Sequence, residues 1–237
     1  MTETPGPSHP DAAKPVAEAR LAASVILLRD TSAGLEAFVQ HRVSTMDFAA
    51  GMVVFPGGRV DTGDYEGWDY APELLERHAK EWRLSSIATA EPDSSAASSQ
   101  ACRSSGTVLA AAIREVQEEA GLTLDPAALR PWANWITPVD MPKRFDTYFY
   151  VAKPAQDAAP QHQTTEAWQS LWMPVDGILS AEAEGKLQLM PPTYYLLREI
   201  SRFDSVDAMW TADHEVVPVL APPGSLAAFL KERASRG

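Results

Sequence analysis

Hydrophobic and polar positions along the chain predict a mixed α/β domain. Short apolar or alternating runs, typical of strands, are separated by turns rich in Gly, Pro and polar residues. The predicted strands are Ala22 to Arg29, Glu36 to Arg42, Met52 to Phe55, Pro131 to Ile136, Phe145 to Ala152 and Val216 to Leu220. The predicted helices are Leu109 to Ala120, Val175 to Glu184, Pro192 to Phe203 and Ser225 to Arg233, the last with Ser225 as N-cap.

The helix predicted at Leu109 to Ala120 has two distinct faces. Residues three and four apart share a helix face, so Glu115, Glu118 and Glu119 converge on one of them. Carboxylates so close repel one another, and a divalent cation reverses that repulsion, because hard oxygen ligands suit Mg²⁺ or Mn²⁺. The other face is an apolar stripe suited to burial, made of Leu109, Ala112, Ile113, Val116 and Ala120.

The ends of this acidic segment carry further signals. Arg114 precedes the first carboxylate and can fix its rotamer through a bidentate contact. Gly121 is a natural residue for the left-handed position that ends a helix. Taken alone, an acidic cluster of this kind is more often a solvated helix face. Its position after an apolar strand and the Gly57-Gly58 turn favours a metal site instead.

Together, Phe55 to Asp61 and Arg114 to Leu122 resemble the Nudix box, the metal-binding signature of enzymes that cleave diphosphates linked to a nucleoside. The family pattern is G-x5-E-x7-R-E-U-x-E-E-x-G-U, in which U is aliphatic. Asp64 stands where the first half of the pattern has Glu, whereas Gly106 occupies the position counted back from Arg114. The box is therefore predicted to be split by an insert at about residues 65 to 105, with Asp64 in a structural role.

The insert consists of two segments with different predicted structures. Tyr65 to Leu84 predicts a short amphipathic helix that begins near Pro72. Ser85 to Gly106 is mostly Ser and Ala, which predicts a mobile loop or linker. The predicted organisation is a disordered tail at 1–19 and one Nudix domain at 20–237, including the insert and a helical extension at about 190–237.

The resemblance implies an α/β/α sandwich with a mixed sheet, and it implies roles for the acidic residues. Glu115, Glu118 and Glu119, with the carbonyl of Gly58, would hold Mg²⁺ or Mn²⁺, and Arg114 would complete the catalytic group. The family uses either a box glutamate or an acid on a later loop as general base. Glu166 is the best later candidate, and its alternative role is a helix N-terminal acid.

Three arginines are candidates for binding substrate phosphates, because the guanidinium fork matches phosphate oxygens. They are Arg42, Arg59 and Arg144, and each could equally be the partner in a structural ion pair. Phe145 and Trp135 are candidates for stacking a base, although buried aromatic residues more often belong to the core.

The split box narrows the resemblance to a Nudix subgroup that includes peroxisomal coenzyme A diphosphatases, as does the segment from Gln40 to Gly58. One departure is Asp47, which stands where that segment has a second basic residue. The first hypothesis is a diphosphatase for coenzyme A or acyl-coenzyme A. The second changes the substrate to NADH, ADP-ribose or a nucleotide sugar, and the third is a Nudix-fold ligand-binding regulator without turnover.

The net charge and the hydropathy of the chain limit the classes of partner that it can be expected to bind. The net charge of −12 argues against nucleic acid and leaves a nucleotide-derived small molecule as the expected partner. No run is long and apolar enough to span a membrane, and residues 1 to 19 lack the apolar segment of a signal peptide. We therefore expect a cytoplasmic protein without a membrane partner, and a homodimer stays open because Nudix domains often dimerise.

Overall fold

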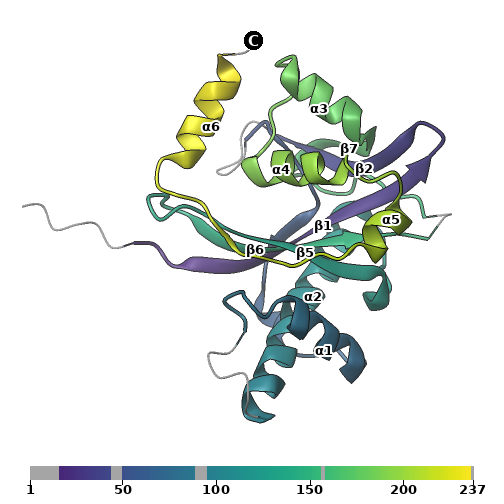
Figure 1. The fold of residues 1–237 in the computed structure, drawn as a ribbon, viewed down its shortest axis with the longest axis vertical. Coiled ribbons are helices and arrows are strands. Elements are labelled where there is room, and N and C mark those ends of the chain that lie inside the picture. Colours follow the sequence, from purple (N-terminus) through teal and green to yellow (C-terminus); the bar gives the residue numbers. More distant parts are fainter. Residues whose placement is uncertain (1–15, 44–49, 89–94, 156–157, 236–237) are drawn as a thin grey trace, which may run out of the picture.

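A mixed β-sheet lies between two layers of helices in the computed structural model, which describes residues 16–43, 50–88, 95–155 and 158–235 (Figure 1). The strands are β1 (Ala19–Thr31), β2 (Gly34–Arg42), β3 (Val53–Val54), β4 (Gly57–Arg59), β5 (Leu129–Ile136), β6 (Arg144–Ala152), β7 (Ala167–Pro174) and β8 (Val219–Leu220). The helices are α1 (Pro72–Glu81), α2 (Ser95–Ala120), α3 (Val175–Ala183), α4 (Pro191–Ile200), α5 (Val206–Thr211) and α6 (Ser225–Ala234), with 3₁₀ turns η1 (Thr62–Tyr65) and η2 (Pro126–Ala128).

The sheet is built around β1, which pairs in parallel with β6 and antiparallel with β2 and β4. Its main path runs β3-β2-β1-β6-β5-β8. Strand β7 pairs antiparallel with β2, and β8 pairs in parallel with β5. The sheet is therefore mixed and open, and with its helices it forms the predicted α/β/α sandwich.

Successive residues of β1 point to opposite faces of the sheet and enter two different cores. Ala23, Val25 and Leu27 pack with α1 and α2 below the sheet, as drawn in Figure 1. Ile26 and Leu28 pack with the helices α3 to α6 on the other face. Burial on both faces explains why this strand is an unbroken apolar run in the sequence.

The insert contains the predicted amphipathic helix, now α1, but its second half is not a loop throughout. Helix α2 begins at Ser95 and runs for 26 residues, so Ser95 to Gly106 extends the box helix. Alanine is the strongest helix former, which explains how a Ser- and Ala-rich stretch can continue a helix. This part of α2 lies close against the first half of the insert, because a Cβ on Gly106 would lie only 2.3 Å from the ring of Trp68. Residues 89–94 lie outside the described parts.

The C-terminal half also departs from the sequence prediction. The N-cap of α6 is Gly224, in the left-handed conformation, and Ser225 is already helical, so the predicted Ser225 cap is wrong. Helix α5 was not predicted, although Ser205 caps it by accepting a hydrogen bond from the Ala208 amide at 3.0 Å. Strand β7 was also missed, because its mixed burial shows no clean alternation.

The beginning of the chain enters the fold earlier than predicted. Strand β1 starts at Ala19, whereas its predicted start was Ala22. The predicted tail falls mostly on residues 1–15, which lie outside the described residues. Among the helices of the described residues, none has both the length and the apolar character needed to cross a membrane.

Candidate active site

The Gly57-Gly58 turn lies directly against the acidic face of α2. The Gly57 amide donates a hydrogen bond to Glu119 Oε2 at 2.9 Å. A Cβ on Gly57 would lie 2.5 Å from the Ala23 carbonyl oxygen, and one on Gly58 would lie 2.3 Å from Glu115 Oε1. Gly57 therefore requires glycine, since a side chain there would collide with the backbone of β1, and a side chain at Gly58 would displace the Glu115 carboxylate.

The two halves of the split box meet in space through Asp64 and Arg114. Arg114 Nε and Nη2 donate to the two oxygens of Asp64 at 3.0 and 2.9 Å, although the residues are 50 positions apart. Arg114 Nη2 also donates to the Arg59 carbonyl at 2.9 Å, and the Asp61 amide donates to Asp64 Oδ2 at 2.8 Å. The hydrogen bonds from Arg114 to Asp64 raise the pKa of Arg114. Asp64 thus acts structurally, by holding the arginine of the second half.

The three predicted carboxylates differ in their surroundings. Arg114 Nη1 donates to Glu115 at 2.8 Å and to Glu118 at 3.2 Å, and Glu118 is largely exposed. Burial raises the pKa of Glu115. Burial also raises the pKa of Glu119 to about 7, against the hydrogen bond from Gly57, and repulsion from Glu115 and Glu166 adds to the rise. A buried carboxylate surrounded by other acids is a position that favours an added positive charge.

This donor set fits a hard divalent cation. Glu115, Glu118 and Glu119 offer carboxylate oxygens beside the backbone of Gly58, and Mg²⁺ and Mn²⁺ prefer oxygen ligands. In the described parts of the chain, no three acidic, histidine or cysteine side chains enclose a metal position by themselves. Magnesium uses few carboxylates and completes its shell with water and substrate phosphate oxygens, so an open set is consistent with this ion.

Arg42 and Glu166, predicted separately as functional residues, contact each other at the same site. Arg42 Nη2 donates to Glu166 Oε2 at 2.9 Å. The Val43 amide donates to the Glu166 carbonyl at 3.0 Å, which ties the loop before β7 to the end of β2. Both side chains line the cavity that contains the acidic residues of α2. Asp47, which marked a departure from the coenzyme A segment, lies outside the described residues.

The other predicted substrate-binding residues are divided between the cavity and its surroundings. Arg59 and Phe145 line the cavity. Arg144 is not part of its lining; its guanidinium donates to the carbonyls of Thr137 at 3.1 Å and Ala17 at 2.7 Å. Arg144 therefore anchors the residues just before β1 to the loop after β5. The sequence had suggested a phosphate-binding role for this arginine.

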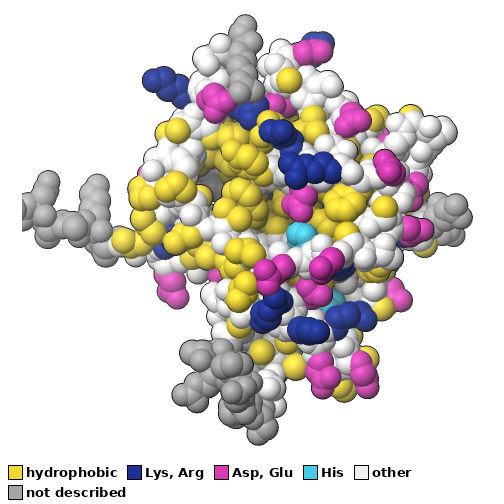
Figure 2. Space-filling model, in the orientation of Figure 1, with side chains coloured by type: hydrophobic (Ala, Val, Ile, Leu, Met, Phe, Trp, Pro, Cys, Tyr) yellow, Lys and Arg dark blue, Asp and Glu magenta, His cyan; other side chains and the backbone are white. Residues whose placement is uncertain are grey.

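One cavity of about 750 Å³ joins the acidic site to an apolar region. Figure 2 shows hydrophobic side chains gathered around a hollow between α6 and α4, above the sheet. The charged lining residues are Arg42, Arg59, Asp61, Arg114, Glu115, Glu118, Glu119 and Glu166. The apolar lining includes Phe55, Trp135, Ile136, Phe145, Phe149, Met190, Tyr195, Leu220, Leu226 and Phe229.

Several residues of this site were not predicted from sequence. Asp61 lines the cavity and repels Glu115, and its signal was its place in the quoted glycine turn. Gln40 is 1% exposed, and its side-chain amide opposes the rise in the pKa of Glu119. A buried polar residue inside an apolar strand was the available signal for Gln40. Tyr195 and the α6 residues gave none, because they reach the cavity only through the tertiary fold.

The sheet, the glycine turn and the acidic helix are those of the Nudix fold, and comparisons with known proteins agree. The family model for the NUDIX domain matches residues 101–194. The structure is similar to that of a NUDIX hydrolase from Alicyclobacillus acidocaldarius, with a TM-score of 0.63 and 22% identity, covering 85% of this chain and 99% of that one. Residues 101–194 therefore match the NUDIX domain family, and the chain has the Nudix fold.

Two curated relatives are similar in sequence. Acyl-coenzyme A diphosphatase NUDT19 of Xenopus laevis is 30% identical over 90 residues, which are 35% of this chain and 23% of that protein. Putative nudix hydrolase 7 of Caenorhabditis elegans is 27% identical over 197 residues, which are 79% of this chain and 62% of that protein. The chain thus spans less than two thirds of the length of either relative.

Proposed function

We propose that this protein is a metal-dependent diphosphatase that hydrolyses coenzyme A or acyl-coenzyme A at its diphosphate bond. The observation that carries this proposal is the convergence of Glu115, Glu118 and Glu119 with Arg42 and Arg59 in one cavity. Carboxylates for a cation and arginines for phosphate oxygens are the two requirements for cleaving a diphosphate.

The acidic residues have separate tasks in this proposal. Glu115, Glu118 and Glu119, with the Gly58 carbonyl, hold Mg²⁺ or Mn²⁺, and the hydrogen bond from Gly57 orients Glu119. The bound cation supplies charge neutralisation on the diphosphate and lowers the pKa of the attacking water. Arg114 is held by Asp64 and positions Glu115 through its Nη1 group.

Arg42 and Glu166 provide the remaining functions. Arg42 binds a phosphate oxygen of the substrate, which replaces Glu166 as its partner. Glu166, more than half exposed and already in the cavity lining, then accepts the proton of the attacking water. The ion pair between them keeps both side chains at the site before substrate binds.

Two observations support coenzyme A thioesters as the substrate class. The match to the frog protein named acyl-coenzyme A diphosphatase reaches 30% identity. The cavity also continues from the acidic site into a region of aromatic and aliphatic side chains, which does not suit a hydroxylated sugar.

The test is a product analysis with Mg²⁺ or Mn²⁺ and a panel of coenzyme A, acetyl-coenzyme A, NADH, ADP-ribose, GDP-mannose and a nucleoside triphosphate. We expect coenzyme A compounds to yield 4′-phosphopantetheine or its acylated form, identified by mass. Preferred cleavage of NADH or a sugar nucleotide would reject this substrate class and retain the chemistry. Binding without turnover of any compound would reject the enzyme and favour a regulator.

A further inference from the structure

The cavity is sharply divided by charge. Its charged lining residues come from β2, the turn from Gly57 to Asp61, α2 and the loop that carries Glu166. The described lining contributed by β5, β6, α4, β8 and α6 contains no charged side chain. One half of the cavity thus suits a diphosphate, and the other half, here called the apolar chamber, suits an uncharged group.

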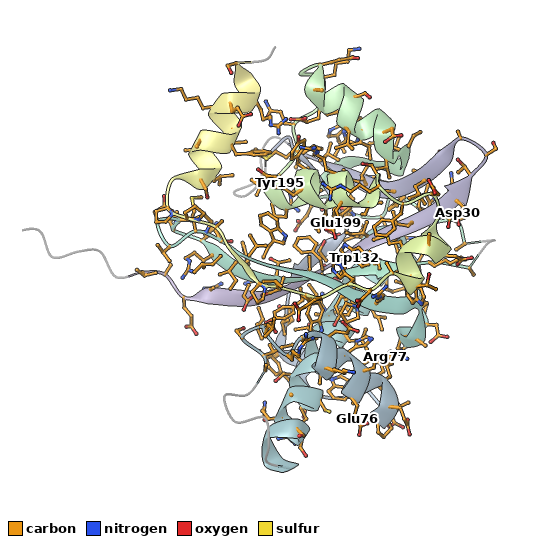
Figure 3. The ribbon with its side chains drawn as sticks, viewed as in Figure 1. Asp30, Glu76, Arg77, Trp132, Tyr195 and Glu199 are labelled. Atoms are coloured by element: carbon orange, nitrogen blue, oxygen red, sulfur yellow. The ribbon has the colours of Figure 1, made fainter. Side chains whose placement is uncertain are left out.

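Aromatic contacts fix the walls of the apolar chamber. Trp135 on β5 and Tyr195 on α4 are stacked, with ring centroids 5.8 Å apart. Phe229 on α6 lies against Tyr194 and Tyr195 at 5.7 and 6.1 Å. Tyr195 is labelled on α4 in Figure 3, and residues of both α4 and α6 line the cavity, so the two helices form walls of the chamber.

Helix α6 is held in this position by Arg233. Its Nη1 group donates to Glu182 of α3 at 3.0 Å, and the Glu182 side chain is only 3% exposed. Its guanidinium also lies 3.9 Å from the ring centroid of Tyr194. A charge pair with one buried partner and a cation–π contact make α6 a fixed wall of the chamber.

Coenzyme A presents two different arms on either side of its diphosphate. One is an adenosine with a further phosphate, and the other is an uncharged pantetheine arm that carries the thiol or acyl group. Placing a phosphate in a chamber without cations would be costly, whereas burying an aliphatic chain is favourable. The chemistry of the lining therefore selects the second arm.

We infer that the apolar chamber binds the acylated pantetheine arm and that Leu226 and Phe229 of α6, with Trp135 and Tyr195, determine specificity for acyl chain length. This inference rests on the proposed diphosphatase function and adds the orientation of the substrate. Each methylene that enters the chamber should raise kcat/KM by up to about fourfold, which corresponds to ~0.8 kcal/mol.

The experiment measures kcat/KM for acetyl-, butanoyl-, hexanoyl- and octanoyl-coenzyme A with Mn²⁺. For the wild-type protein we expect the octanoyl-to-acetyl ratio to exceed about tenfold. Leu226→Trp fills the chamber and should reduce that ratio to near one. Ala228→Trp places the same side chain on the exposed face of α6 and should keep the wild-type ratio. A flat chain-length series in the wild-type protein, or an unchanged ratio in Leu226→Trp, would overturn the inference.

Inhibitors without the diphosphate bond test the orientation independently of turnover. S-octanoyl pantetheine should compete with substrate in the wild-type protein and lose at least tenfold in affinity in Leu226→Trp. Adenosine 3′,5′-bisphosphate should inhibit both proteins equally. Loss of inhibition by the bisphosphate in Leu226→Trp would show that the chamber is the nucleoside site instead. Absence of turnover of every coenzyme A compound would reject the proposed function itself, which is a different result.

Discussion

Asp64→Asn tests whether the split box is joined by the contact between Asp64 and Arg114. The substitution keeps the size of the side chain and one oxygen that can accept from the Asp61 amide. It removes the charge to which Arg114 donates two hydrogen bonds at 3.0 and 2.9 Å. Asp64 is buried, so solvent cannot replace the lost partner.

The expected cost follows from the burial of the two groups. Hydrogen bonds to charged groups contribute about 1.5–3 kcal/mol each, and breaking a buried ion pair costs about 3–5 kcal/mol. The Arg114 side chain is 26% exposed and keeps its contacts with Glu115, Glu118 and the Arg59 carbonyl. We therefore expect a loss of roughly 2–3 kcal/mol in the free energy of unfolding, and a Tm lower by roughly 5–10 °C.

Chemical and thermal unfolding of the wild-type protein, Asp64→Asn and the control Asp69→Asn provide the measurement. Asp69 lies in the same segment with an exposed side chain, so its substitution should change the free energy of unfolding by less than about 0.5 kcal/mol. Asp64→Asn should also require more Mn²⁺ for half-maximal turnover, because the released Arg114 remains beside Glu115 and competes with the cation. Equal stability of the two variants would refute the structural role of Asp64.

Four further predictions concern the rest of the molecule. Burial lowers the pKa of His78 from 6.5 to about 4, so protonation of this side chain favours the unfolded chain. The free energy of unfolding should therefore fall by up to ~3 kcal/mol as the pH is lowered from 6.5 to 4. In urea titrations, His78→Gln should flatten this pH dependence. Gly106→Ala should lower the free energy of unfolding by about 1–2 kcal/mol in thermal unfolding, because the collision of its Cβ with Trp68 outweighs the ~1 kcal/mol that Ala gains over Gly in a helix. Arg42→Ala should lower kcat/KM by about 10- to 100-fold in steady-state assays through the loss of charged hydrogen bonds to phosphate. Glu166→Gln should lower kcat by about 100-fold or more and leave Tm nearly unchanged, because the Glu166 side chain is half exposed and glutamine can still accept from Arg42. A kcat like that of the wild-type protein would exclude Glu166 as the base.

The parts of the fold that the sequence predicted correctly are those governed by local patterns. The box helix has both an apolar stripe and an acidic face, and its end at Gly121 has a positive φ of 66°, as a helix-ending glycine requires. Helix α1 was predicted from its N-terminal Pro72 and its amphipathic spacing. In each case neighbouring residues within one or two turns carry the information.

The elements that escaped prediction depend on distant contacts or on weak local signals. The Ser- and Ala-rich stretch from Ser95 to Gly106 has helix-forming residues but no apolar periodicity, and it becomes helical as a continuation of α2. Strand β7 is defined by pairing with β2, more than a hundred positions earlier. The amino-acid composition of a segment predicts neither the continuation of a neighbouring helix nor pairing with a distant strand.

The same distinction holds within the site. The convergence of the carboxylates of α2 on one helix face was predicted from their spacing. The contact between Arg42 and Glu166 joins residues 124 positions apart, and the apolar chamber brings β5 together with α4 and α6. Arg144 illustrates the reverse case, since a plausible phosphate-binding arginine instead donates to the carbonyls of Ala17 and Thr137.

The most direct test of the central proposal compares the wild-type protein with Glu119→Gln in the hydrolysis of coenzyme A with Mn²⁺. Glutamine keeps the shape of the buried side chain and removes the charge that would hold the cation, so we expect Tm to be retained or raised. We expect 4′-phosphopantetheine from the wild-type protein and none above background from the variant. Turnover at the wild-type rate by a folded Glu119→Gln protein, with the metal present, would contradict the proposed site.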